Sequence, residues 1–414
     1  MDAFLSDLFD ILKINTIYNT DVKPFGSGNI KCLNLMLEKG LKNGFKVKNY
    51  ENYFGYIEYG SGNDLLGILC HLDVVDVNTD KWNTDPFNPT IKDNKIYARG
   101  IQDDKGPLMC AFYALKELKE ENFIPKCRIR LIMGCNEESG SLCMKKYSEV
   151  EEAPTFSFSP DAEYAVIYGE KGIMVLKISG KIDSKIKELH AGVKHNIVPD
   201  YTKVVMKDNK EYEYFGKSAH AMNPSLGVNS ISVAINDLKS RYEDIFINFL
   251  DKYFTNDTKA EKINAAMNDS EMHDLTMNLA ILDIKDDYFS MTIDYRLPKD
   301  CLKDTIVSNI NSIIKDYNFN LEILEFMPVH YVDKGSFLVK TLLNAYRKNT
   351  NDYETEPMVI GGGTYAKSFN NSVAFGTKFP HEEEVCHIDN EYVDINSLKL
   401  NIKILIDAIK ELTK

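Results

Sequence analysis

The stretch Leu65-Leu-Gly-Ile-Leu-Cys-His71-Leu-Asp73-Val-Val-Asp76 decides the fold class. An apolar run of this length, closed by polar residues, is typical of a buried strand in an α/β sheet. Ligands of open α/β sheets bind outside the carboxyl ends of the strands, which is where His71 and Asp73 stand. Residues two apart on extended backbone point to the same face, so they could form a metal ligand and its hydrogen-bonding partner. The alternative at this point is a hydrogen-bonded strand end without a metal.

Length, charge and cysteine content exclude several classes of protein. The chain has 414 residues, enough for two domains with separate hydrophobic cores. Its net charge of -13 argues against a nucleic-acid partner, because phosphate binding needs a basic face. The eight cysteines include no Cys-x-x-Cys pair. No apolar run is long enough to span a membrane, and the N-terminus carries no export signal. We therefore expect a cytoplasmic protein with no membrane partner.

Three further segments carry carboxylates at strand ends or strand-to-helix turns: Asp103-Asp104 before a helix, Glu137-Glu138 after a strand, and Asp161 after another strand. One such acidic turn is an ordinary helix entry, because acids are stabilised at the positive end of a helix. Several that converge on one sheet edge would repel one another unless cations lie between them. The sequence therefore favours a metal site at this edge.

The pattern of elements predicts an inserted domain. Residues 1–171 alternate strands and helices in the α/β manner, and this pattern returns at 329–414. The intervening residues 172–328 are richer in strands, with a helix predicted over 229–250 and a hairpin over 275–297. Because strands and helices recur twice between 172 and 328, we expect two similar α+β halves there.

Isolated motifs elsewhere indicate less. His195-Asn196, Ala219-His220 and Asp294-Tyr-Arg296 lie in the inserted region, where lone His and Arg residues on strands are usually structural. The loop from Gly361 invites comparison with a phosphate-binding loop, but Ala366 stands where the second glycine is required, and no basic residues surround it. We therefore expect no nucleotide site.

Taken together, these segments resemble the co-catalytic metallopeptidase family of aminoacylase, carnosinase and glutamate carboxypeptidase. The resemblance covers nearly the full length and rests on segments that agree in order and placement: His71-Leu-Asp73, Gly100-Ile-Gln-Asp103-Asp104-Lys-Gly, Glu137-Glu138-Ser-Gly, Asp161 and His387. Three others look most like the branch of the bacterial dipeptidase PepV: Asn196-Ile-Val-Pro-Asp, Ala219-His220-Ala and Gly362-Gly-Thr-Tyr.

The resemblance implies two metal positions that share five ligands: His71, Asp103, Glu138, Asp161 and His387. Asp103 would bridge the two cations, with His71 and Asp161 on one side and Glu138 and His387 on the other. Histidine and carboxylate ligands suit zinc, and also manganese. The implied cofactor is therefore two divalent metal ions, with zinc preferred.

The resemblance also implies the other site roles. Asp73 would hydrogen-bond His71 and fix its ring, and Glu137 would act as the general base. His220 would donate a hydrogen bond to the developing oxyanion. Asn196 and Arg296 would bind the substrate carboxylate, and the Gly361–Thr364 loop, with Gly362 and Thr364, could offer backbone donors to the same group.

Two assignments have rivals within the sequence. His381 lies six residues before His387, but His387 matches the family position, with acids following it. Asp103 is preferred over Asp104 because the family's bridging aspartate is followed by one residue, then Lys and Gly. The resemblance further implies a cis Asp103–Asp104 peptide bond, against base rates that strongly favour trans.

We therefore expect an α/β protein whose catalytic domain, with a mixed sheet flanked by helices, is interrupted by an inserted α+β lid domain at 172–328. The expected activity is metal-dependent hydrolysis of dipeptides or very short peptides, by a monomer, with a dimer as the alternative. Two rival functions are an N-acyl amino acid amidohydrolase and a catalytically silent peptide- or metal-binding protein. Glu137 counts against silence, because a binder needs ligands but no base.

Overall fold

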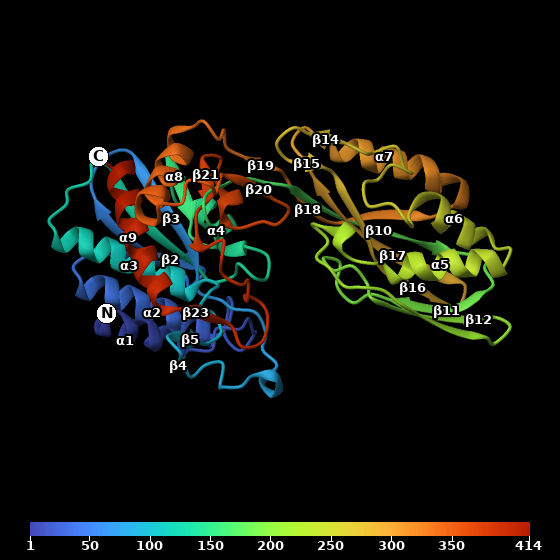
Figure 1. The fold of residues 1–414 in the computed structure, drawn as a ribbon, viewed down its shortest axis with the longest axis horizontal. Helices are drawn as coiled ribbons and strands as arrows, with labels where there is room; N and C mark the ends of the chain where they lie inside the picture. The colour runs from blue at the N-terminus through green and yellow to red at the C-terminus, as the bar shows by residue number, and fades with distance from the viewer. The chain divides into compact units, whose positions relative to one another are not determined.

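The computed structural model describes residues 1–414 and separates into two compact units (Figure 1). Unit 1 comprises Met1–Tyr168, Val332–Met358 and Gly363–Lys414, and unit 2 comprises Gly169–Tyr331 and Val359–Gly362. The chain thus passes between units at 168/169 and 331/332, where the sequence suggests 171/172 and 328/329. That unit 2 acts as a lid stays a prediction. None of the helices combines the length and apolar character needed to cross a membrane.

Unit 1 is organised around a mixed sheet with the strand order β1-β2-β6-β3-β7-β21. The order continues with β9 and β19, and β20 pairs with β9; these three strands contain residues assigned to unit 2. In that order the strands are β1 (Lys46–Tyr50), β2 (Phe54–Gly60), β6 (Arg128–Gly134), β3 (Leu65–His71), β7 (Phe156–Ser159), β21 (Ser372–Ala374), β9 (Ile167–Glu170), β19 (His330–Tyr331) and β20 (Met358–Ile360). Strand β3 is parallel to its neighbours β6 and β7. Strand β2 is antiparallel to its neighbours β1 and β6. The predicted mixed sheet is therefore confirmed.

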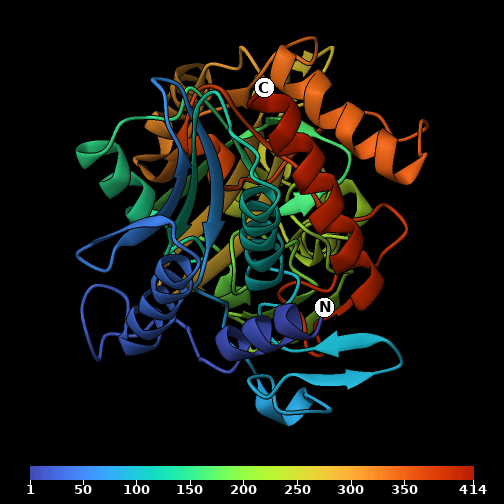
Figure 2. The ribbon, with the colours of Figure 1, turned by 90° about the vertical axis from the view of Figure 1, so that its left-hand side faces the viewer.

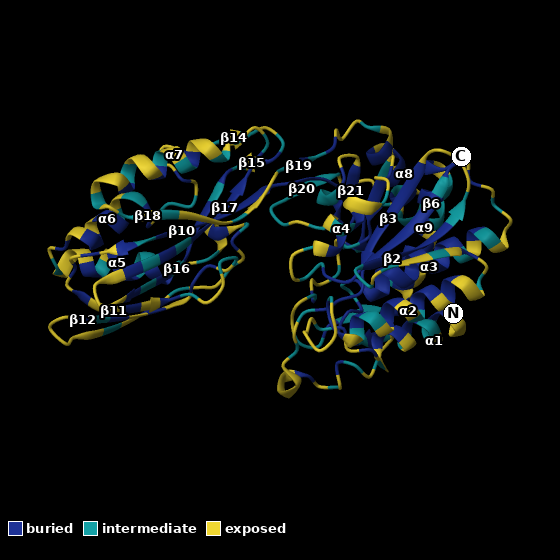
Figure 3. Ribbon diagram, turned by 180° about the vertical axis from the view of Figure 1, so that it is seen from behind, coloured by how far each residue is buried: buried dark blue, intermediate teal, exposed yellow.

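Every residue of β3 is buried, because helices and loops cover both faces of the sheet (Figure 3). The helices of unit 1 are α1 (Asp2–Leu12), α2 (Ser27–Lys42), α3 (Lys105–Glu120), α4 (Leu142–Val150), α8 (Phe337–Thr350) and α9 (Ile395–Leu412), with short 3-10 turns at η1 (Thr79–Lys81) and η4 (Tyr365–Ser368). Helix α3 is buried almost throughout its first three turns, as expected of an interior helix. It runs beside α9, the red helix in Figure 2.

A small three-stranded sheet brings distant parts of unit 1 together. It consists of β4 (Thr90–Lys92), β5 (Lys95–Tyr97) and β23 (Tyr392–Asp394). The pair β5–β23 is antiparallel, with Tyr97 opposite Tyr392. A second short pair joins β8 (Ala162–Glu163) to β22 (Thr377–Lys378). The turn after β5 and the loop before β23 are therefore held next to each other.

Unit 2 contains one antiparallel seven-stranded sheet, in the order β13-β12-β11-β16-β17-β10-β18. Its strands are β13 (Glu211–Phe215), β12 (Tyr201–Met206), β11 (Ile186–Ala191), β16 (Thr276–Lys285), β17 (Tyr288–Leu297), β10 (Gly172–Lys181) and β18 (Asn320–Met327). The remaining elements are α5 (Ser230–Arg241), α6 (Ile245–Tyr253), α7 (Lys303–Ile314), η2 (Pro224–Leu226), η3 (Lys315–Tyr317), and the pair β14 (Asn268–Asp269) and β15 (His273–Asp274). The helices pack on one face of the sheet, and their outer sides are exposed (Figure 3).

The strands of this region form a single sheet, and its division into two similar halves stays a prediction. One expectation was wrong. The helix predicted over 229–250 is two helices, because Asp244 begins a new one. Its Oδ1 accepts the backbone N–H groups of Phe246 and Ile247 at 2.8 and 2.9 Å, which satisfies the open end of α6. The predicted hairpin is present as β16 and β17.

Replacing Asp244 with alanine is expected to destabilise the protein. The carboxylate caps α6 and also accepts the hydroxyl of Ser184 at 2.8 Å, so its loss should lower the free energy of unfolding by about 1–3 kcal/mol. Urea denaturation measures this. Asp304→Ala, which removes an exposed first-turn acid of α7 with no capping bond, should change stability by less than about 0.5 kcal/mol. Equal stability of the two variants would contradict the capping role.

Candidate metal centre

The centre lies where three adjacent parallel strands end. Strands β6, β3 and β7 are neighbours in the sheet, and His71 is the last residue of β3. Glu137 and Glu138 follow β6 by a few residues, and Asp161 follows β7. Because the carboxyl ends of parallel strands meet at one edge, these side chains come from segments far apart in the sequence to one place.

All five predicted ligands converge there. The Nε2 atom of His71 lies 2.8 Å from Oδ1 of Asp103 and 3.5 Å from Oδ2 of Asp161. The Nε2 atom of His387 lies 2.9 Å from Oδ2 of Asp103 and 3.0 Å from Oε1 of Glu138. Asp103 therefore offers one carboxylate oxygen to each histidine, as a bridging ligand would.

The tautomer of His71 and the acceptors around its ring fit a bound cation. Its Nδ1 lies 2.9 Å from the carbonyl oxygen of Asp73, which can only accept, so Nδ1 carries the proton. In the neutral ring Nε2 is then an acceptor, and it faces the carboxylate oxygens of Asp103 and Asp161. Nε2 of His71 and Oδ1 of Asp103 are both buried and 2.8 Å apart, and as two acceptors they have no hydrogen bond unless a proton lies between them. A buried group of acceptors needs a shared positive charge, and a divalent metal ion supplies it.

The ionisation of the centre shows the same excess of negative charge. Burial and the neighbouring carboxylates raise the pKa of Glu138 and Asp161 above their usual values. Burial raises the pKa of Glu137 well above its usual value, and the carboxylate of Asp161 adds to this. Hydrogen bonds to Asp103 and Glu138 raise the pKa of His387 to about 11. In the absence of metal, protons therefore take the place of the cations.

Asp73 acts differently from the prediction. The ring of His71 bonds to its backbone carbonyl, while its carboxylate Oδ1 is 3.6 Å from Nδ1. The two carboxylate oxygens instead accept the backbone N–H groups of Glu137 and Glu138 at 2.9 and 3.0 Å. Asp73 thus fixes the ring of His71 through its main chain and the acidic turn through its side chain.

The carboxylate of Asp104 fixes the backbone of His71. The Asp103–Asp104 peptide bond is cis, as the resemblance implies. Asp104 is fully buried, and its Oδ2 accepts the backbone N–H of His71 at 2.9 Å. The choice of Asp103 as the bridging residue agrees with these contacts, because Asp104 is occupied with the backbone of β3.

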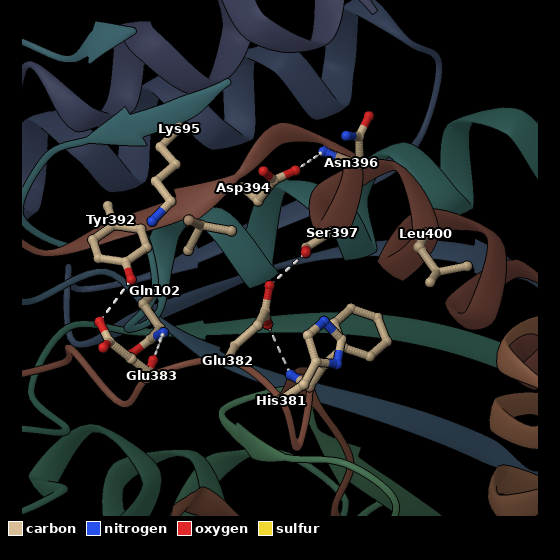
Figure 4. A pocket seen from close by; sticks show the side chains of 12 residues that line it. Lys95, Gln102, His381, Glu382, Glu383, Tyr392, Asp394, Asn396, Ser397 and Leu400 are labelled. Atoms are coloured by element: carbon tan, nitrogen blue, oxygen red, sulfur yellow. Dashed lines mark hydrogen bonds between the residues drawn. The ribbon is translucent and has the colours of Figure 1, made fainter. Parts of the chain in front are cut away.

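His381, the rival of His387, lies elsewhere. It stacks on Phe379, with ring centroids 5.8 Å apart, and lines a cavity of about 450 Å³ beside Gln102 and Tyr392 (Figure 4). His387 is the histidine that contacts Asp103 and Glu138. The assignment of all five residues as ligands stays a prediction, which this geometry supports.

The predicted substrate-binding residues are mostly in unit 2. His220 accepts the backbone N–H of Met222 at Nδ1, 3.1 Å away, so its neutral ring carries a proton on Nε2, as a hydrogen-bond donor to an oxyanion must. Arg296 is 3% exposed, and its guanidinium is paired with Asp294 at 2.7 and 2.9 Å and bonded to the carbonyl of Gly361 at 2.9 Å. One N–H on each terminal nitrogen remains for a substrate carboxylate.

Two of the other residues accept backbone hydrogen bonds. The backbone carbonyl of Asn196 accepts the N–H of Ala221 at 2.8 Å. Gly362 belongs to unit 2 and Thr364 to unit 1, where the hydroxyl of Thr364 accepts the N–H of Ala366 at 3.1 Å and begins η4. The roles of these residues in binding substrate stay predictions.

Residues 67–411 match the family model described as peptidase family M20/M25/M40. The chain belongs to this family. A protein of Staphylococcus epidermidis named "Putative dipeptidase" is 35% identical over 456 aligned residues, covering 99% of this chain and 96% of that protein. A protein of the same name from Staphylococcus aureus is 34% identical over 457 aligned residues, covering 99% and 97%. The family resemblance seen in the motifs is thereby confirmed, and the protein is a metallopeptidase.

Solved structures of similar fold cover essentially the whole M20/M25/M40 chain. Human carnosine dipeptidase 1 has a TM-score of 0.61 at 15% identity, covering 100% of this chain and 96% of that chain. Aminoacylhistidine dipeptidase from Vibrio alginolyticus has a TM-score of 0.67 at 13% identity, covering 99% and 96%. At these identities the comparison shows the fold, and the predicted α/β class is confirmed.

The affinity of the metal-free protein for zinc or manganese is expected to rise with pH. A cation must displace the proton that His387 holds, because the pKa of that ring is raised to about 11 by Asp103 and Glu138. Binding should therefore release about one proton or more, and the dissociation constant should fall between pH 6 and pH 8. Calorimetry in buffers of different ionisation enthalpy measures the released protons. Equal affinity at both pH values, with no proton release, would contradict this charge assignment.

Proposed function

We propose that this protein is a dipeptidase that uses two divalent cations, zinc or manganese, to hydrolyse dipeptides or very short peptides with a free amino end. The observation that carries the proposal is the carboxylate of Asp103, whose two oxygens face two different histidines at a buried sheet edge. The names of the staphylococcal relatives support the substrate class. We place the protein in the cytoplasm, since all eight cysteines are free.

The proposed chemistry divides the work between metal and protein. Two bound cations would polarise the scissile carbonyl and lower the pKa of a water molecule. His71, Asp103, Glu138, Asp161 and His387 would hold them. The chain's own contribution is then proton transfer at the reacting atoms and orientation of the substrate.

Glu137 is the proposed general base. Asp73 fixes the backbone of both glutamates, and the carboxylate of Glu138 faces His387, so the adjacent Glu137 is left for proton transfer. The burial that raises its pKa makes its carboxylate a better proton acceptor, and bound cations would favour its ionised form. Glu137 takes a proton from the attacking water and passes it to the nitrogen of the leaving amine.

The remaining proposed roles concern the substrate. The Nε2–H of His220 would donate to the developing oxyanion, and the tautomer set by Met222 supports this. Arg296 would contact the substrate carboxylate with the two N–H groups that Asp294 and Gly361 leave available. Asn196, Gly362 and Thr364 are proposed to complete the binding site.

Glu137→Ala is expected to lower kcat by about 100- to 10,000-fold without loss of bound metal, because it removes the base and no ligand. Hydrolysis of a dipeptide and the metal content by mass spectrometry test the two halves of this statement. Glu138→Ala, which removes the adjacent carboxylate, should lose metal as well as activity. Metal loss from the Glu137 variant would make Glu137 a ligand instead.

A substrate panel distinguishes the proposed peptidase from an acyl-amino-acid hydrolase. The protein, loaded with zinc or manganese, is expected to hydrolyse dipeptides with free amino ends at least about tenfold faster, by kcat/KM, than the matching N-acetyl amino acids. Treatment with a chelator should abolish the activity, and metal should restore it. A preference for the N-acetyl compounds would overturn the dipeptidase assignment and leave the metal centre standing.

A further inference from the structure

Two loops of unit 1 bring the bridging Asp103 and the exposed His387 together, and Glu391 joins the first loop to the second. Its carboxylate is fully buried and accepts four hydrogen bonds from the turn before α3. The donors are Arg99 Nη1 at 2.8 Å, Gly100 N at 3.0 Å, Gln102 N at 2.7 Å and Asp103 N at 3.3 Å. The turn that ends at Asp103 is thus wrapped around a side chain four residues beyond His387.

Gln102 also joins the two loops, but here the side chain belongs to the first loop and bonds to the backbone of the second. Its Oε1 accepts the backbone N–H groups of Val385 and Cys386 at 2.9 and 2.8 Å. Its Nε2 donates to the carbonyl of Glu383 at 3.3 Å, a bond drawn in Figure 4. The side chain immediately before the bridging aspartate therefore holds the chain immediately before His387.

His387 is further held by the contacts of its ring with Asp103 and Glu138 and by the adjacent Ile388, whose carbonyl accepts Arg99 Nη2 at 3.1 Å. The side chain of His387 is 53% exposed, and its backbone has a φ of 61°, in the left-handed region. The residue is held by fixed points on both sides, at 385–386 through Gln102 and at 391 through its buried carboxylate. Its position relative to Asp103 consequently depends on these hydrogen bonds more than on packing around the ring.

We propose that Glu391 and Gln102 are positioning residues, and we call this pair the clasp. The clasp sets the spacing between Asp103 and His387. It thereby sets the affinity of the metal position that Asp103, Glu138 and His387 would form, which we call the second position. The inference rests on the proposed two-metal function. Residues that orient metal ligands through hydrogen bonds commonly change metal affinity when they are replaced. The alternative is a purely structural role, in which the clasp stabilises the fold next to the paired strands β5 and β23 and leaves metal affinity unchanged.

Gln102→Ala is the main test, because it removes one half of the clasp and leaves no buried charge unpaired. Metal-free wild type and variant are titrated with Zn²⁺ by calorimetry and with Co²⁺ by visible absorption. The expected result is a 10- to 100-fold weaker second binding step, a first step within about threefold of wild type, and an altered Co²⁺ spectrum. Asp389→Asn is the matched control, because it removes a carboxylate from the same loop, and it should bind both ions as wild type does.

Glu391→Gln tests the other half of the clasp. The amide keeps one acceptor oxygen but turns an NH₂ group toward two donors, so the second binding step should weaken at least as much as in Gln102→Ala. If this variant fails to fold, Gln102→Ala decides alone. Two wild-type binding steps and an unchanged Co²⁺ spectrum in Gln102→Ala would overturn the clasp. Failure of the wild-type protein itself to bind two ions would overturn the proposed function instead.

Discussion

The centre depends on one constraint: Asp103 shares its two carboxylate oxygens between two histidines at a buried sheet edge. His71 presents Nε2 as an acceptor because its Nδ1 proton is committed to the carbonyl of Asp73. Acceptors that face one another at a buried sheet edge repel unless protons or cations lie between them. The metal-free protein meets the requirement with protons, as the raised pKa of His387 shows. Metal binding is therefore an exchange of protons for cations.

Several carboxylates around this centre accept hydrogen bonds from backbone N–H groups and so fix the main chain. Asp104 accepts the N–H of His71, Asp73 accepts the N–H groups of Glu137 and Glu138, and Glu391 accepts those of the turn that ends at Asp103. These carboxylates are directed at backbone N–H groups, whereas the carboxylates of Asp103 and Glu138 are directed at histidine rings. A cluster rich in acids is thus divided into those that face the cations and those that fix the chain.

The groups proposed to bind substrate are also arranged before any substrate is present. The N–H of Met222 sets the tautomer of His220, and Asp294 orients the guanidinium of Arg296 on two of its nitrogens. A group held in place loses little conformational entropy when it meets its ligand. The price is that a substrate carboxylate must approach Arg296 in the presence of Asp294.

The sequence by itself determined the parts that depend on local pattern and residue chemistry. Alternation and apolar runs predicted β3, β6 and β7, and the acids at their ends indicated a metal site because parallel strands end at one edge. Only the tertiary structure decided the rest. It placed His387, which the family position already favoured, beside Asp103 and Glu138, directed the carboxylate of Asp73 to the backbone of the acidic turn, and revealed Gln102 and Glu391 as a pair. Those contacts join residues from 64 to 289 positions apart, and no local periodicity reports on hydrogen bonds between such distant segments. For the same reason the strand order of the sheet in unit 2 could not be predicted from the sequence, since strand order is set by long-range pairing.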